Sequence, residues 1–165
     1  MLEKIYYQEM YYEFNDCIIL GAGLDTFSLR LPIWAQSLRI IEVDHPASQR
    51  DKLSRLVKAG IDIPKNVQFV EINFTETSLE DGLKGILIKD KPVFFVWLGV
   101  MMYLKESVID EVLTFIGKQP KKSELVLSWI TENSNSVSFA STSMNNNVSI
   151  SEQVAAMGEP FVCYF

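Results

Sequence analysis

Two glycines stand directly after a short apolar run near the start of the chain. Gly21 and Gly23 follow Ile18-Ile19-Leu20 and are separated by Ala22, and Asp25 comes two residues later. Because glycine has no Cβ, its backbone can approach a ligand closely, and the amides at the start of a following helix can bind polar groups. The spacing therefore predicts a ligand-binding turn between a strand and a helix, with an ordinary tight turn as the alternative.

A second apolar run ends in the acidic segment Glu42-Val43-Asp44, about 20 residues after the glycines. Nucleotide-binding folds place an acidic residue at this position, where it accepts hydrogen bonds from ribose hydroxyls. Asp44 also precedes Pro46, so a capping role at the next helix is the alternative, and the two roles can coexist. His45, the only histidine, is interpreted as a solvated or capping residue rather than a general base. The glycines and Asp44 together predict a ligand that contains a nucleoside.

Thr26 decides part of the question of which nucleotide binds. It stands where the dinucleotide fingerprint Gly-x-Gly-x-x-Gly requires its third glycine. A pyrophosphate is therefore disfavoured, which argues against an NAD-dependent oxidoreductase. S-adenosylmethionine has no phosphate and needs only the turn, the ribose carboxylate and a slot for adenine.

The elements that must position these residues alternate along the chain. Parallel strands buried on both faces are predicted from short apolar runs, at residues 17–20, 38–43, 67–72, 93–98 and 125–130. Amphipathic helices are predicted over 46–59 and 106–116, the first with Ala47, Leu53, Leu56 and Val57 on its apolar face. The helical patterns over 26–31 and 79–88 are poorer, because Pro32 follows the first and two glycines interrupt the second. This order predicts an α/β fold with an open, mostly parallel sheet and helices on both faces.

Composition narrows the class of protein. The 165 residues, of which 48% are apolar and 22% charged, suit one globular domain over 1–165, with a short helix over 1–15 and a flexible polar loop over 131–151. The net charge of −6 opposes binding to nucleic acid. No signal peptide and no run of about 18 apolar residues is present, so we expect no membrane segment and a cytoplasmic location. Cys17 and Cys163 lack the spacing of a metal or redox site.

Several motifs, taken in order, resemble the leucine carboxyl methyltransferase family. The resemblance is carried by Leu20-Gly21-Ala22-Gly23-Leu24-Asp25-Thr26, Arg30-Leu31, Glu42-Val43-Asp44-His45-Pro46, Trp97-Leu98-Gly99-Val100-Met101-Met102-Tyr103-Leu104 and Gly158-Glu159-Pro160-Phe161. It implies a Rossmann-like class I methyltransferase fold with S-adenosylmethionine as cofactor. It also implies O-methylation of a carboxylate or hydroxyl on a small molecule or a peptide.

The same resemblance implies the cofactor site. Gly21 and Gly23 would lie under the methionine part of the cofactor, Asp44 would hold the ribose, and Asn73 with Phe74 would flank the adenine. The full set of expected cofactor-binding residues is Gly21, Ala22, Gly23, Asp25, Asp44, Asn73, Phe74 and Leu98. No catalytic residue is assigned, because a carboxylate acceptor is already anionic at neutral pH and needs no general base.

The sequence also departs from the family pattern. Leu98 stands where family members have an acidic residue that holds the amino acid end of the cofactor, and Asn73 stands where they have Asp. About 16 residues precede the first strand, with no arginine for the methionine carboxylate, and the chain ends before the last strands expected of such a sheet. The missing ends predict an incomplete sheet that self-associates or is marginally stable unless another chain covers it. Together with Leu98 they leave a non-catalytic, truncated cofactor-binding remnant as the alternative function.

Overall fold

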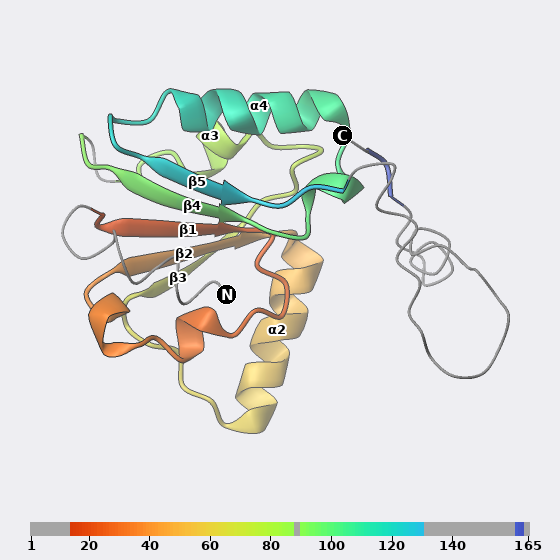
Figure 1. Ribbon diagram of the computed structural model, residues 1–165. Coiled ribbons are helices and arrows are strands. Elements are labelled where there is room, and N and C mark those ends of the chain that lie inside the picture. The colour runs from red at the N-terminus through yellow and green to blue at the C-terminus, as the bar shows by residue number, and fades with distance from the viewer. Residues whose placement is uncertain (1–13, 88–89, 131–160, 164–165) are drawn as a thin grey trace, which may run out of the picture.

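The chain forms an α/β structure in which parallel strands alternate with helical segments (Figure 1). The computed structural model describes residues 14–87, 90–130 and 161–163. The strands are β1 (Asp16–Leu20), β2 (Arg39–Asp44), β3 (Val67–Glu71), β4 (Val93–Trp97) and β5 (Glu124–Leu127). The helices are α2 (Pro46–Ala59), α3 (Leu79–Gly82) and α4 (Glu106–Gly117), with short 3-10 helices η1 (Phe27–Leu29), η2 (Ile33–Ala35) and η3 (Met101–Tyr103).

The strands form one parallel sheet in the order β3-β2-β1-β4-β5. The central strand β1 pairs with β2 on one side and β4 on the other, so that Ile18 lies opposite both Ile41 and Phe95. The chain moves outward from β1 through β2 to β3 and then returns to the other side of β1 as β4. In open α/β sheets this reversal leaves a crevice beyond the carboxyl ends of the strands, where ligands bind.

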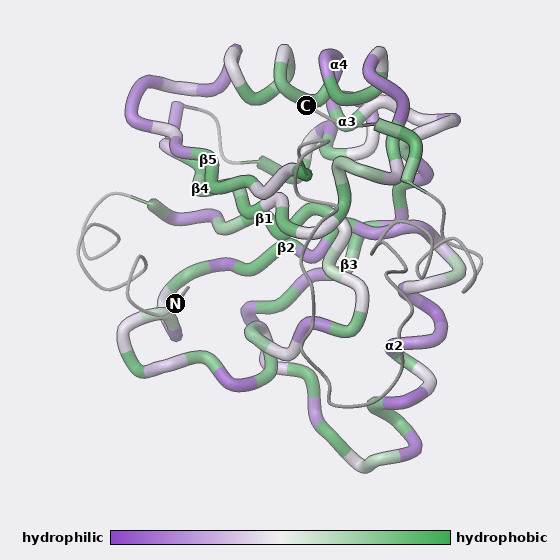
Figure 2. Tube along the Cα trace, turned by 45° about the vertical axis from the view of Figure 1, so that its right-hand side comes forward, coloured by the Kyte–Doolittle hydropathy of each residue, from purple (hydrophilic) through white to green (hydrophobic). Residues whose placement is uncertain are grey.

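Helices cover both faces of the sheet, as the sequence predicts. α3 and α4 lie on one face, whereas η1, η2 and α2 lie on the other (Figure 1). Because side chains alternate along a strand, Ile18 and Leu20 belong to the core under α3 and α4, called the first core, while Cys17 and Ile19 belong to a second core beside η1 and η2. The trace coloured by hydropathy shows the central strands as mainly hydrophobic and α2 as mixed (Figure 2).

The boundaries of the predicted helices are confirmed in part. α2 covers 46–59 as predicted, with Pro46 in its first turn and Gly60 ending it at a φ of 65°. α4 extends one residue beyond the predicted end at 116. The helix predicted over 79–88 ends at Gly82, and Gly85 has a left-handed φ of 76° that an α-helix does not contain.

The predicted apolar face of α2 is wrong in two of its positions. Val57 is 80% exposed and Ala47 is also exposed, whereas α2 buries Gln49, Lys52 and Leu56. The apolar face of a helix is predicted from the spacing of its apolar residues alone. Such a prediction misses a polar side chain that is buried because it bonds to a buried partner.

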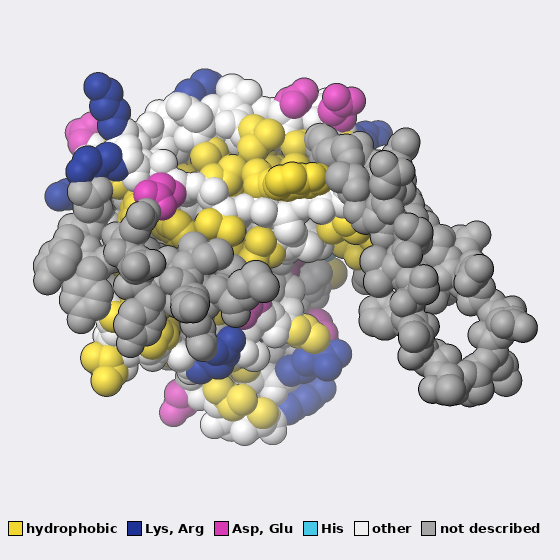
Figure 3. All heavy atoms as spheres, in the orientation of Figure 1, with side chains coloured by type: hydrophobic (Ala, Val, Ile, Leu, Met, Phe, Trp, Pro, Cys, Tyr) yellow, Lys and Arg dark blue, Asp and Glu magenta, His cyan; other side chains and the backbone are white. Residues whose placement is uncertain are grey.

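The outer strands are less buried than the sequence predicts. β3 is an edge strand of the described sheet, and of its residues Val70 is buried. β5 lies at the other edge, is partly exposed, and is followed by Trp129, whose surface is 56% exposed. Hydrophobic side chains gather over this edge, below α4 (Figure 3). Self-association, expected from an uncovered apolar edge, stays a prediction.

Some predictions fall on parts of the chain that lie outside the described residues. These are the polar loop over 131–151 and most of the helix over 1–15, of which Phe14 and Asn15 are described and are not helical. In the described ranges, no helix has the length and apolar character needed to cross a membrane.

Cys17 gives a simple test of the second core. Its side chain is fully buried, and this burial, together with the charges of Asp16 and Asp25, raises the pKa of the thiol to about 12. Because the thiolate is the reactive form, we expect iodoacetamide at about pH 8 to leave Cys17 unlabelled in the folded protein and to label it in concentrated guanidinium. Peptide mass spectrometry measures both. Equal labelling under the two conditions would show that the second core is open.

Candidate functional site

The turn after β1 is fixed to the end of β2 by backbone hydrogen bonds. The amides of Gly21 and Ala22 both donate to the carbonyl of Val43, at 2.7 and 3.2 Å, and the amide of Asp25 donates to the carbonyl of Ala22 at 2.9 Å. Gly21 and Gly23 have positive φ angles of 66° and 49°. Residues with a Cβ rarely adopt such angles, so the conformation of the turn itself favours glycine at both positions.

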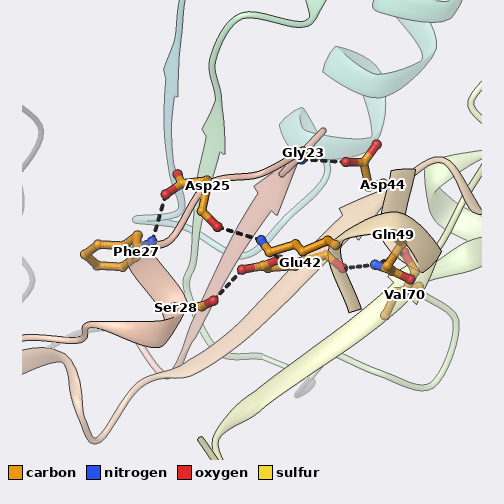
Figure 4. A network of polar contacts seen from close by, with 9 residues as sticks. Gly23, Asp25, Phe27, Ser28, Glu42, Asp44, Gln49 and Val70 are labelled. Atoms are coloured by element: carbon orange, nitrogen blue, oxygen red, sulfur yellow. Dashed lines mark hydrogen bonds and ion pairs between the residues drawn. The ribbon is translucent and has the colours of Figure 1, made fainter. Parts of the chain in front are cut away.

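Asp44 joins this turn to the carboxyl end of β2. One oxygen of its carboxylate accepts a hydrogen bond from the amide of Gly23 at 2.5 Å (Figure 4). The other accepts from the amide of His45 at 2.6 Å. The helix cap is His45, whose Nδ1 accepts from the amide of Ala47 at 3.2 Å. The interpretation of His45 as a capping residue is therefore confirmed, and Asp44 does not cap the helix. The predicted meeting of the turn and the acidic residue is present.

A cleft of about 230 Å³ opens beside Asp44, at the carboxyl end of the sheet. Asn73 and Phe74 follow β3 and border it, and the amide of Ile72 donates to the carbonyl of Asp44 at 2.9 Å, which holds the two strand ends together. The side-chain oxygen Oδ1 of Asn73 accepts from the amide and the hydroxyl of Thr75, at 3.1 and 2.8 Å, which fixes the Asn73 side chain. The cleft is lined by Gly21, Asp44, His45, Ile72, Asn73, Phe74, Thr75, Val100 and Leu104.

Behind the turn lies a buried ion pair. Glu42 of β2 and Lys52 of α2 are 1% and 3% exposed, and their charged groups lie 2.5 Å apart. The hydroxyl of Ser28 donates to the other oxygen of Glu42, and the Lys52 ammonium also donates to the carbonyl of Asp25 at 2.6 Å. The cluster connects β2, α2 and the residues that follow the glycine turn (Figure 4).

The family model of leucine carboxyl methyltransferases matches residues 2–117, which is well over half of the chain. The chain belongs to the leucine carboxyl methyltransferase family. A curated relative from Bacillus subtilis strain 168, "Putative S-adenosyl-L-methionine-dependent methyltransferase YktD", is 34% identical over an alignment 165 residues long, which covers 99% of this chain and 53% of the relative. The chain thus spans about half the length of that relative.

Solved structures resemble this member of the family in fold. An O-methyltransferase family protein from Burkholderia thailandensis has a TM-score of 0.57 at 18% identity, over 85% of this chain and 40% of the other. The glycopeptide N-methyltransferase MtfA, crystallised with S-adenosyl-L-methionine, has a TM-score of 0.53 at 12% identity, over 82% of this chain and 56% of the other. The predicted family and the Rossmann-like class I methyltransferase fold are both confirmed.

Four of the residues that the family resemblance implies for the cofactor border the cleft together. They lie at the carboxyl ends of three parallel strands: Gly21 after β1, Asp44 at the end of β2, and Asn73 with Phe74 after β3. Gly23 lies beside them, with its amide bonded to Asp44. Their assignment to a cofactor stays a prediction.

The other predicted residues lie away from the lining of the cleft. Ala22 is buried in the second core, and Leu98 is half-buried against the same core. The Asp25 carboxylate accepts from the amide of Phe27 at 2.7 Å and so holds the start of η1. A three-residue η1 stands where a helix N-terminus was expected, and its first amide is already bonded to Asp25. The Phe27 amide is therefore not free to bind a ligand, as the amides of a following helix were expected to be.

Sequence reasoning missed several lining residues of this family member. Val100 reaches the cleft in place of Leu98, because the chain turns at Gly99 with a φ of 71° after β4 ends. The other missed lining residues are next to or within motifs that the sequence analysis had identified. His45 follows Asp44, Ile72 and Thr75 lie within two residues of Asn73, and Leu104 ends the motif over 97–104. A charged residue, Glu42, inside an apolar strand was the sequence signal for the buried ion pair. That Lys52 is its partner could not be predicted from the sequence.

Proposed function

We propose that this chain binds S-adenosylmethionine and belongs to an enzyme that methylates an oxygen nucleophile, a carboxylate or hydroxyl of a small molecule or a peptide. The observation that carries the proposal is the meeting of the glycine turn, Asp44 and the Asn73-Phe74 pair at one cleft, in a member of this methyltransferase family. The relative YktD carries S-adenosyl-L-methionine-dependent methyltransferase in its name, which supports the same cofactor here.

The chemistry of the lining residues fits a nucleoside. Each carboxylate oxygen of Asp44 accepts one backbone hydrogen bond and has a further lone pair, which can accept from ribose hydroxyls. Asn73 offers an amide and Phe74 an aromatic ring, which suit the edge and the face of adenine. The cleft volume of about 230 Å³ is below the roughly 300–1,000 Å³ of most small-molecule sites, so these residues enclose part of the cofactor.

The residues of this chain have few chemical tasks in such a reaction. S-adenosylmethionine would supply the methyl group: the oxygen nucleophile would bond to the methyl carbon in line with the breaking C–S bond, and S-adenosylhomocysteine would leave. The protein contributes alignment, so rigid placement of Gly21, Asp44 and Phe74 matters more than any proton transfer. Leu98 provides no carboxylate for the ammonium end of the cofactor, and we expect weaker binding than in family members with an acidic residue there.

Calorimetry with S-adenosylmethionine, S-adenosylhomocysteine and NADH tests the proposal. We expect the first two ligands to bind at least ten times more tightly than NADH, because Thr26 replaces the third glycine and the Phe27 amide is already bonded. Tight binding of NADH with neither of the others would favour an oxidoreductase and defeat the proposal. Binding without methyl transfer to any carboxylate or hydroxyl acceptor would instead favour the non-catalytic alternative.

A further inference from the structure

The buried lysine beneath the glycine turn has an unusual position for its residue type. The Lys52 side chain is 4% exposed, although lysine is rarely buried unless it is paired. Its ammonium lies 2.5 Å from the Glu42 carboxylate and 5.9 Å from the centre of the Phe69 ring. These contacts compensate the buried charge of Lys52. They do not explain why a charged residue stands at this position in α2.

Both partners of this pair are held from outside it. The second oxygen of Glu42 accepts from the hydroxyl of Ser28, so both oxygens are used. One turn before Lys52, the Gln49 amide donates to the carbonyls of Glu42 and Val70 at 3.1 and 3.4 Å (Figure 4). Gln49 thereby fixes α2 against β2 and β3, and the helix presents the ammonium from a rigid support.

The remaining contact of the ammonium reaches the glycine turn. Lys52 donates to the carbonyl of Asp25 at 2.6 Å. The turn is therefore bonded at its start, where the Gly21 amide meets Val43, at its middle, where the Gly23 amide meets Asp44, and at its end by Lys52. A hydrogen bond from a charged donor is stronger than one between neutral groups.

We propose that Lys52 is a positioning residue, which holds the end of the glycine turn so that Gly23 and Asp44 are set in place before the cofactor arrives. The inference rests on the proposed cofactor binding. A preformed turn does not have to be ordered during binding. The entropic cost of ordering it is therefore not subtracted from the binding free energy, and affinity is higher. Lys52 acts through the turn and lies outside the lining of the cleft.

A purely structural role predicts a different pattern of mutant effects. A buried ion pair can often be replaced by neutral residues of similar size with little loss of stability, whereas removing one partner leaves a buried charge unpaired. If Lys52 only balances the charge of Glu42, neutralising both residues restores both the stability of the protein and its affinity for the cofactor. If Lys52 positions the turn, neutralising both restores folding and leaves affinity impaired.

The experiment compares Lys52→Met, Glu42→Gln and the double variant, using thermal unfolding and calorimetry with S-adenosylhomocysteine. We expect each single variant to unfold at a lower temperature and the double variant to recover most of the loss. The double variant is expected to bind at least tenfold more weakly than the wild type. Lys58→Met, at an exposed lysine in the last turn of the same helix, is the matched control and should leave affinity unchanged, with at most a small loss of stability from the helix dipole. A double variant that binds within threefold of the wild type overturns the proposal.

Hydrogen exchange without ligand separates this inference from the proposed function. In the double variant we expect the amides of Gly23, Asp25 and Phe27 to exchange at least tenfold faster, while amides in the middle of β1 keep their protection. Unchanged exchange in the turn refutes the positioning role, whatever calorimetry shows. If the wild type binds neither S-adenosylmethionine nor S-adenosylhomocysteine, the proposed function fails, and the claim that Lys52 raises affinity fails with it. The hydrogen exchange rates of the turn then decide whether Lys52 holds the turn.

Discussion

Alanine at position 21 is expected to destabilise the protein far more than alanine at position 60 and to weaken cofactor binding at least tenfold. Both glycines have almost the same φ, 66° and 65°. A Cβ at Gly60 would meet nothing within 4 Å, whereas a Cβ at Gly21 would lie 2.3 Å from Cγ2 and 3.2 Å from Cβ of Val100. Because the Val100 Cβ is itself close, rotation of that side chain cannot fully relieve the clash, and the backbone must move.

The pair of variants separates two costs. A left-handed alanine costs roughly 1–2 kcal/mol, which both variants suffer. Overpacking adds about 1–3 kcal/mol in Gly21→Ala alone, so we expect a total of about 2–5 kcal/mol there. Urea unfolding measures the free energies, and calorimetry with S-adenosylhomocysteine measures affinity, which Gly60→Ala should leave unchanged. Equal losses of stability in the two variants would show that the turn does not pack against Val100.

The fold was predictable because its evidence is local. Apolar runs of strand length and the stripe along α4 each lie within a few neighbouring residues, and Pro46 and Gly60 mark the ends of α2. The exposed Val57 and the buried Lys52 were not predictable in this way. The environment of Lys52 depends on Glu42 of β2 and on Asp25 of the glycine turn, which meet α2 only after the sheet has formed.

The candidate site was predictable to the extent that it follows the strand ends. Gly21, Asp44 and Asn73 each come at or just after the end of a parallel strand, and parallel strands bring those ends to one edge of the sheet. The sequence does not predict which residue of the loop after β4 reaches the cleft. The left-handed turn at Gly99 selects Val100 over Leu98, and no periodic pattern reports such a turn.

Asp44→Asn is expected to weaken binding of S-adenosylhomocysteine by about 1–3 kcal/mol, or roughly 5- to 150-fold. The carboxylate already accepts from the amides of Gly23 and His45, so asparagine, with one acceptor oxygen, must abandon one of these bonds. It also loses the charge that favours ribose hydroxyls as donors. Calorimetry on the wild type and the variant measures the loss. Ser78→Ala, which removes the cap of α3 outside the cleft, is expected to cost about 1 kcal/mol of stability and no affinity.

A 2′-deoxy form of S-adenosylhomocysteine decides how Asp44 acts. If its carboxylate binds the ribose hydroxyls directly, deoxygenation and Asp44→Asn remove the same contact, and their combined loss of affinity is smaller than the sum of the separate losses. If Asp44 acts only by holding the amide of Gly23, the two losses add, because the missing hydroxyl and the missing acceptor then belong to different contacts. Additive losses within about 0.5 kcal/mol would therefore reassign Asp44 from ligand binding to the support of the turn.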